Sequence, residues 1–301
     1  MAAPQTQIPL QEILRSHAAW LENPRAGFRA DLSALTLNDA DLHDVALARA
    51  FLVGTTLLDA NLAGADLSGA VMKSADLQRA NLAGADLTSA DLSLADFGGA
   101  WLRNASLSEA VMHRANFRRA KLGHARMFDA EVQECWFTGV TAESMSLHRS
   151  RFFDVDWSDA DLTLAQFYRS RLQHCRMANI AASGASFDGA AIDHCDLSRA
   201  ALEDAKFHGA VILRCSFHDA DLRRADFRDA SLKGGDFSAA VLAGARFGGA
   251  RLVTADFRGA NLAGARELTA EQLMQSHTDR ATILPNGAHG PYMRYSGAER
   301  P

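Results

Sequence analysis

The sequence is poor in several residue types on which common protein classes depend. Only 8% of its 301 residues are aromatic, and it contains six Pro and four Cys. Four Cys in a chain of this length do not form the dense disulfide framework of small secreted domains. No run of 18 apolar residues occurs, and the first residues lack the continuous apolar segment of a secretory signal. We therefore expect a cytoplasmic protein with reduced thiols and no membrane contact.

The excess of one charge sign is also small. The formal net charge is −5, which favours neither direct nucleic-acid binding nor an acidic tail. The charges are nevertheless spread unevenly along the chain. Residues 30–100 carry a net charge of −7, residues 101–180 carry +2 and residues 181–262 carry −1. The first third is therefore acidic, and the remainder is mixed.

Ala and Leu dominate the apolar residues, and they recur every five positions. In the stretch ANLAGADLTSADLSLADF, at residues 80–97, the unit is Ala, then Asp or Asn, then Leu or Phe, then two small or polar residues. The central apolar position continues without insertion from Leu32 to Leu262, which gives 47 units. A period of five residues matches neither the side-chain period of a helix nor that of a strand. Only a chain that turns a corner at every unit therefore keeps these residues on one side.

A second period, four times as long, shows how many corners close one coil. Aromatic residues recur at every twentieth position in two series: Phe97, Phe117, Phe137, Trp157, and Phe167, Phe187, Phe207, Phe227, Phe247. This period contains four units, so each coil has four sides. Where the central residue is small, at Ala142 and Ala182, the residue two positions earlier is larger, at Val140 and Ile180. This exchange conserves the volume of a close-packed interior.

The runs ADLSGA, ANLAGADL and ADFRGANLAGA resemble the pentapeptide repeat family, whose pattern is A-[D/N]-L-x-x. The resemblance covers about residues 30–265. It implies an all-β solenoid, a right-handed quadrilateral β-helix of about twelve coils, with Ala or Cys and the central Leu or Phe inside. Stacking at roughly 4.8 Å per coil gives an expected rod of about 56 Å.

The two ends of such a solenoid expose unpaired backbone and require caps. One helical stripe holds the apolar residues of the first segment: Leu10, Ile13, Leu14, His17, Trp20 and Leu21. Thr269 and Gln272 form a capping-box pattern, which predicts a short helix with Leu273 and Met274 inward. We therefore predict short α-helical caps, at residues 1–29 and 266–287, on a β-helix of residues 30–265. Residues 288–301 form a flexible tail, and the C-terminal cap is the expected interface of any homodimer.

No catalytic, cofactor-binding or metal-binding pattern emerges from the sequence. The pairs His174-Cys175 and His194-Cys195 are separated by one coil period, but each Cys occupies an inward position and each His an outward one. Their donor atoms diverge, whereas zinc requires four converging ligands. Together with Cys215, these cysteines are interpreted as buried small hydrophobic residues rather than disulfide partners. We predict no enzyme, no cofactor and no metal site.

A rigid rod without a catalytic set favours a role in binding other proteins. We expect a non-enzymatic bacterial interaction or scaffold protein, such as an adaptor in a secretion or toxin-delivery system. The coil period places Arg149, Arg151, Arg169 and Arg171 together in two adjacent coils. We expect these like charges to lack sufficient counter-ions, and the planar guanidinium group suits carboxylates. The sequence therefore predicts that an acidic protein surface binds these four arginines.

The family resemblance also supplies an alternative function. Some pentapeptide repeat proteins mimic DNA, bind DNA gyrase or topoisomerase IV and protect them from quinolones. The acidic first third, with Asp66, Asp76 and Asp86 as its acidic face, fits this alternative. The basic middle region, the extra coils and the lack of a projecting loop weigh against it.

Overall fold

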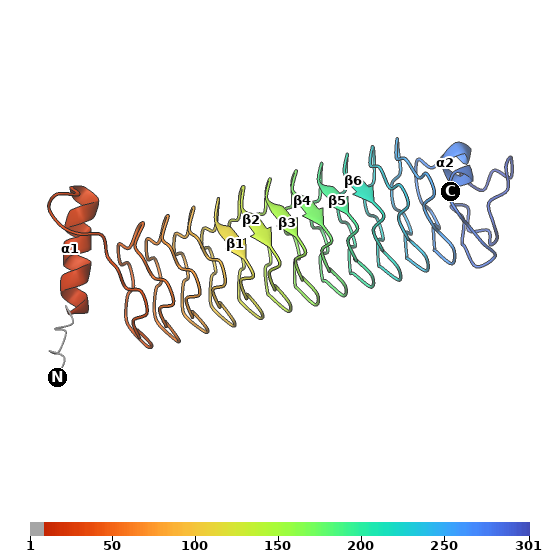
Figure 1. Cartoon of the computed structure of the whole chain (residues 1–301). Helices are drawn as coiled ribbons and strands as arrows, with labels where there is room; N and C mark the ends of the chain where they lie inside the picture. The colour runs from red at the N-terminus through yellow and green to blue at the C-terminus, as the bar shows by residue number, and fades with distance from the viewer. Residues whose placement is uncertain (1–8) are drawn as a thin grey trace.

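The computed structural model of the chain describes residues 9–301, and the main body is a rod of stacked coils. From Asp31 to Arg266, parallel backbone pairing joins residues that are one coil period apart. Figure 1 shows the coils following one another along a single axis, with α1 (Leu10–Glu22) at one end and α2 (Ala270–Met274) at the other. The predicted all-β parallel solenoid is therefore confirmed.

Four ladders of paired residues run along the rod, one for each five-residue side. We name the sides by their ladders: face A begins at residue 31, face B at 36, face C at 41 and face D at 46, and each continues in steps of twenty. The chain visits these faces in the order A, B, C, D. Faces A and C are therefore opposite each other, and so are faces B and D.

Regular strands form only on face A. Six of them make one parallel sheet in chain order: β1 (Val111–His113), β2 (Glu131–Gln133), β3 (Arg151–Phe153), β4 (Arg171–Gln173), β5 (Ala191–Asp193) and β6 (Val211–Leu213). Elsewhere among residues 9–301 the parallel pairing consists of isolated bridges. The predicted fold class, a parallel β-solenoid, is thus confirmed. The predicted uniform β-helix of about twelve coils is not, because neighbouring coils pair as regular strands only between β1 and β6.

The corner that follows each strand explains this difference. On the other coils of face A the corner closes with a turn hydrogen bond, as from the Ala95 amide to the Leu92 carbonyl (3.1 Å). After β1 the Ala115 amide instead donates to the Cys135 sulfur of the next coil (3.3 Å). After β2 to β6 the turn bond is also missing, and the inward residue is larger than Ala: Cys135, Val155, Cys175, Cys195 and Cys215. Size alone does not open the corner, because the buried Thr55 on the same face keeps its turn bond to the Leu52 carbonyl (3.3 Å). Where the turn bond is missing, three residues stay extended and pair as a strand.

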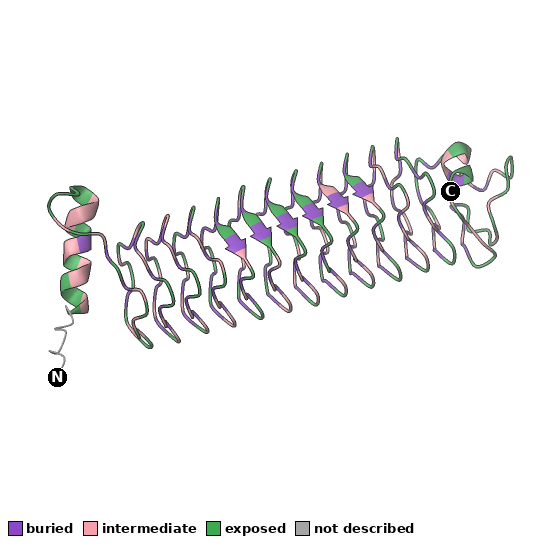
Figure 2. Cartoon of the chain, in the orientation of Figure 1, coloured by how far each residue is buried: buried purple, intermediate pink, exposed green. Residues whose placement is uncertain are grey.

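In the core, similar side chains of successive coils stack on one another along the rod axis. Figure 2 shows buried residues recurring along the stacked coils. Phe207 lies between Phe187 and Phe227, with ring centroids 5.0 and 4.9 Å away and the rings nearly parallel. The series from Phe97 to Trp157 stacks in the same way, with centroids 4.2–4.7 Å apart. The predicted inward register is confirmed over these coils.

Helix α1 covers part of the first coil. It begins directly after Pro9, and its His17 is fully buried, with Nδ1 accepting a hydrogen bond from the Ala30 amide (3.0 Å). The cover is incomplete, since a hollow of about 680 Å³ remains between the start of the helix and Leu35 and Leu37. Leu37, predicted to be inward like every other central residue, is only half-buried. No earlier coil packs against it.

Helix α2 caps the other end through the predicted capping box. The Thr269 side chain accepts a hydrogen bond from the Gln272 amide, and the Gln272 side chain accepts one from the Thr269 amide. Gln272 Nε2 also donates to carbonyls of the last coil, including that of Phe247 (2.9 Å). Leu273 is buried as predicted, but Met274 is 51% exposed. Placing both inward was wrong, because consecutive residues of a helix point about 100° apart.

The tail, residues 288–301, makes contacts with this cap. The Tyr292 amide donates to Thr278 Oγ1 (2.8 Å), and Ala298 is buried. Of the helices in residues 9–301, neither is both long enough and apolar enough to cross a bilayer.

The stacked core predicts a large loss of stability when one ring is removed. Phe207→Ala deletes a ring that is fully buried between two others, and the free energy of unfolding should fall by about 3–5 kcal/mol. Phe153→Ala is the matched control, because Phe153 lies on the outer surface of β3 and is 42% exposed. It should cost less than about 1 kcal/mol. Equal losses for the two variants in urea unfolding would contradict the assigned register.

Candidate protein-binding surface

The four arginines singled out in the sequence lie in two adjacent coils. Arg151 and Arg171 open β3 and β4 and are direct partners in the parallel pairing of these strands. Arg149 and Arg169 lie at the corner where face D turns into face A, with φ of 59° and 54°. All four side chains are exposed. We call these four residues the arginine face.

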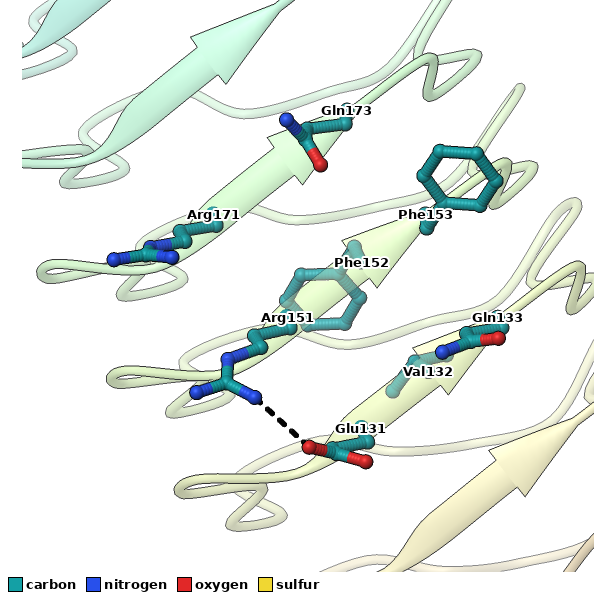
Figure 3. Close-up of a pocket in the computed structure, with 8 residues that line it drawn as sticks. All are labelled: Glu131, Val132, Gln133, Arg151, Phe152, Phe153, Arg171 and Gln173. Atoms are coloured by element: carbon teal, nitrogen blue, oxygen red, sulfur yellow. Dashed lines mark hydrogen bonds and ion pairs between the residues drawn. The ribbon is translucent and has the colours of Figure 1, made fainter.

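Two of these arginines have counter-ions, which the sequence analysis did not name. Arg149 donates from Nε and Nη2 to the two carboxylate oxygens of Asp129, at 2.9 and 2.5 Å. Arg151 Nη1 donates to Glu131 Oε1 at 2.9 Å (Figure 3). The guanidinium of Arg149 lowers the pKa of the Asp129 carboxyl below its usual value. Each acid lies twenty residues before its arginine, in the preceding coil. The coil period could therefore have predicted both ion pairs.

The other two arginines form no ion pair within residues 9–301. Arg169 lies over the ring of Tyr168, with its guanidinium carbon 5.0 Å from the ring centroid. Arg171 stands beside Arg151, and Figure 3 shows it without a partner among the residues drawn. The arginine face therefore keeps two guanidinium groups that can bind carboxylates from outside.

A shallow hollow of about 240 Å³ lies on face A beside these groups. Charged residues line one side of it, and the exposed ring of Phe153 stands at the other side, as Figure 3 shows. The hollow is lined by eight residues of three strands: Glu131, Val132, Gln133, Arg151, Phe152, Phe153, Arg171 and Gln173. Its chemistry suits the binding of a carboxylate next to an apolar group.

The three aspartates of the alternative hypothesis do not form one acidic face. Asp66 and Asp86 are paired neighbours on face D, whereas Asp76 lies on face B, on the opposite side of the rod. Each carboxylate accepts a hydrogen bond from the backbone amide two residues later, at 3.0, 2.9 and 3.1 Å. These aspartates stabilise the local turns.

The His-Cys pairs diverge in the structure. The rings of His174 and His194 stack outside the coil, with centroids 5.2 Å apart, while Cys175 and Cys195 are buried. All four cysteines of the chain are free thiols in the core.

The family of the chain follows from its match to a family model. The pentapeptide repeat model matches residues 57–93, 90–127, 183–219, 200–238 and 236–266, which together are just over half of the chain. The chain therefore belongs to the pentapeptide repeat family.

Solved structures of this family resemble the chain. HetL, a pentapeptide repeat protein involved in heterocyst differentiation regulation in the cyanobacterium Nostoc sp. strain PCC 7120, is 25% identical, with a TM-score of 0.51 over 94% of this chain and 99% of HetL. QnrB1, a plasmid-mediated fluoroquinolone resistance protein, is 21% identical over 59% of this chain and 80% of that one, with a TM-score of 0.32. The latter score is too low to support any argument about shape or role. No curated protein sequence matches the chain.

The buried thiols predict a pH-dependent stability. Burial raises the pKa of Cys135 from its ordinary 9.0 to about 11, because the thiolate is disfavoured in the core. The contribution of this group to stability is therefore fully present below pH 9.0 and is lost as the pH rises towards 11. Cys135→Ala introduces the residue that most units carry at this position. Its loss of unfolding free energy between about pH 8 and 10.5 should be about 1–2 kcal/mol smaller than that of the wild type. Identical pH profiles in urea unfolding would show that the pKa of Cys135 is the same in the folded and the unfolded chain.

Proposed function

We propose that this chain is a non-enzymatic scaffold or adaptor protein that binds other proteins through the outer surface of its rod. The observation that carries this proposal is the arginine face, where Arg169 and Arg171 are exposed beside the sheet and form no ion pair with any residue from 9 to 301. Arg binds carboxylates through its planar fork of donors, and unpaired like charges are electrostatically costly to hold together. An acidic protein surface is therefore the proposed partner.

The construction of the rod supports a role that depends on shape. Its interior is filled by Ala, Leu and stacked aromatic rings, so a partner must bind on the outside. The coils are held to each other by backbone hydrogen bonds along every face, which makes the surface a fixed template. The likeness to HetL, a protein involved in regulation, also supports a regulatory rather than a catalytic role.

In its specific form, the proposal is a bacterial, cytoplasmic adaptor of a secretion or toxin-delivery system. It acts without direct contact with nucleic acid or membrane. Its second expected contact is a homodimer through the C-terminal cap. Three exposed side chains offer apolar surface for such a contact, one in the cap and two in the tail that follows it: Met274, Met293 and Tyr295.

The DNA-mimic alternative has less support. The three aspartates named for it lie on opposite faces, and the middle of the rod is basic. We therefore expect that micromolar protein neither inhibits gyrase nor protects it from a quinolone in a DNA supercoiling assay. Clear protection that disappears when Asp66 and Asp86 are changed to Lys would replace the proposed function with mimicry.

The proposed partner site predicts a loss of binding without a loss of folding. Changing Arg149, Arg151, Arg169 and Arg171 to Gln should weaken capture of the native partner at least tenfold, since it removes the complementary charge. The far-UV circular dichroism and the melting temperature should change little, because exposed ion pairs contribute little to stability. Wild-type affinity should fall as salt rises.

The matched control replaces four exposed arginines that are paired elsewhere on the rod: Arg79, Arg114, Arg224 and Arg258. The control changes the net charge equally and should retain the partner. If both quadruple variants lose the same proteins to the same degree, the binding reflects overall charge, and the arginine face has no special role.

A further inference from the structure

The arginine face continues around a corner onto face D, where the rod has a second hollow. We propose that this hollow takes an aliphatic side chain of the partner, while the adjoining arginines take its carboxylates. The ligand is thus a protein segment in which Leu, Ile or Met is flanked by Asp or Glu. This inference rests on the proposed function and specifies the partner chemistry for that surface.

The hollow on face D has a volume of about 510 Å³, and its largely polar lining includes two large side chains with apolar surface. Leu164 and Tyr168 line it and are 51% and 40% exposed, respectively. The same coil then continues directly to Arg169 and Arg171. One coil therefore presents, in sequence, an aliphatic group, an aromatic ring and two guanidinium groups without counter-ions.

Leu164 is unusual for the place it occupies. Its φ is 59°, in the left-handed region that disfavours residues with a side chain. In every other coil, from Asp44 to Gly264, the corresponding corner position holds Gly or a polar residue. Leu164 thus combines a strained backbone with an exposed apolar side chain, and neither feature contributes to the core. Burial of the Leu164 side chain against a partner would contribute favourably to binding, because it removes apolar surface from water.

Gly184, in the next coil, keeps Leu164 accessible. A Cβ atom at Gly184 would lie 2.9 Å from Leu164 Cδ2, closer than normal contact. A larger residue there would therefore press against the leucine and fill part of the hollow. The small residues Gly184 and Ser186 form the floor next to the leucine wall.

The charges around the hollow favour an acidic ligand. Lys206 lines the hollow and, like Arg169 and Arg171, forms no ion pair within residues 9–301. Asp188 is the acid that lines it, and its carboxylate accepts a hydrogen bond from the His208 amide (2.9 Å). Lys206 and Asp188 thus line the hollow as one cation and one carboxylate, and Arg169 and Arg171 add two cations at the adjoining corner and on face A. Complementary charge of this kind selects partners and speeds their association.

Tyr168 and Arg169 are of the residue types that dominate binding energy at protein interfaces. Tyr and Arg are enriched among such residues, and they act best around a pocket from which water is excluded. The stack of Arg169 on Tyr168 holds the guanidinium at the rim between the two faces. An aliphatic side chain in the hollow would lie next to this rim, so an acidic neighbour on the same segment would reach Arg169 or Arg171.

The test is selection from a library of random dodecapeptides displayed on phage, with the full-length chain as the immobilised target. We expect enriched peptides to contain Leu, Ile or Met close to Asp or Glu. Fluorescence anisotropy with the best synthetic peptide then measures affinity. The double variant Leu164→Ser/Tyr168→Ser and the double variant Arg169→Gln/Arg171→Gln should each bind this peptide at least tenfold more weakly. The arginine variant should also lose most of the salt dependence.

Two further variants distinguish binding at this hollow from non-specific hydrophobic binding. Leu94→Ser changes another exposed leucine with the same backbone conformation (φ 62°) on a different corner, and it should bind the peptide like the wild type. Gly184→Ala should weaken binding at least threefold by crowding the hollow. The inference is overturned if no acidic-aliphatic peptide is enriched, or if the Leu164/Tyr168 variant binds within twofold of the wild type.

The result is distinguishable from a failure of the proposed function. If the Leu164/Tyr168 variant still captures the native partner while the four-arginine variant does not, the proposed function stands and the hollow on face D is not part of the site. If neither variant affects capture, both proposals fail.

Discussion

The hydrogen bonds between neighbouring coils are the constraint on which the rest of this structure depends. The Leu32 amide donates to the carbonyl of Phe51 in the next coil, and the Phe51 amide donates back to the carbonyl of Ala30. Repeated on four sides, this pattern fixes the coil at four units. Every side chain then lies over its counterpart in the next coil, both in the core and on the surface. The stacked rings and the ion pairs between coils, such as Arg149 with Asp129, are consequences of that one register.

The same register separates the surface from the stability of the fold. Inward positions admit a narrow range of volumes, as the buried Ala142 with Val140 and Ala182 with Ile180 show. Outward positions are limited mainly by the backbone conformation of the corners, where residues as different as Leu94, Arg149 and Asp129 all adopt a positive φ. A rod of this kind can therefore carry almost any arrangement of charges and apolar groups without repacking its core. Arg149 and Asp129 illustrate one such pair, and Leu164 beside Tyr168 another.

Much of this architecture could be predicted from the sequence because it depends on period alone. The inward stack around Phe207 and the placement of Arg151 beside Arg171 follow from counting in fives and twenties, and the capping box at Thr269 follows from its local T-x-x-Q pattern. The inward placement of Met274 failed, because a one-turn helix leaves too few residues to define a stripe. The half-buried Leu37 was missed because a period says nothing about where the stack ends.

The candidate site was predicted less completely than the fold. The counter-ions Asp129 and Glu131 could have been predicted from the coil period, because each lies twenty residues before its arginine. The six strands of face A lie where the corner lacks its turn hydrogen bond, and the period of the sequence does not show which corners keep that bond. The hollow beside Leu164 depends on the combined shape of three coils, so a linear pattern of residues does not reveal it.

The fixed register also determines how the chain tolerates changes of length. Removing four consecutive units shortens the rod by one coil and leaves every later residue on its own face. Removing a single unit, such as residues 136–140, keeps Ala and Leu inward but moves everything downstream to the adjacent side. Arg149 then lies over His124 instead of Asp129, and Arg151 over Arg126 instead of Glu131. Such a deletion would disturb the core at the junction, where the stacked Phe137 and the volume of Val140 are lost, and it would also shift the whole downstream surface to a new face. The position of each unit within the coil therefore determines which groups the surface brings together.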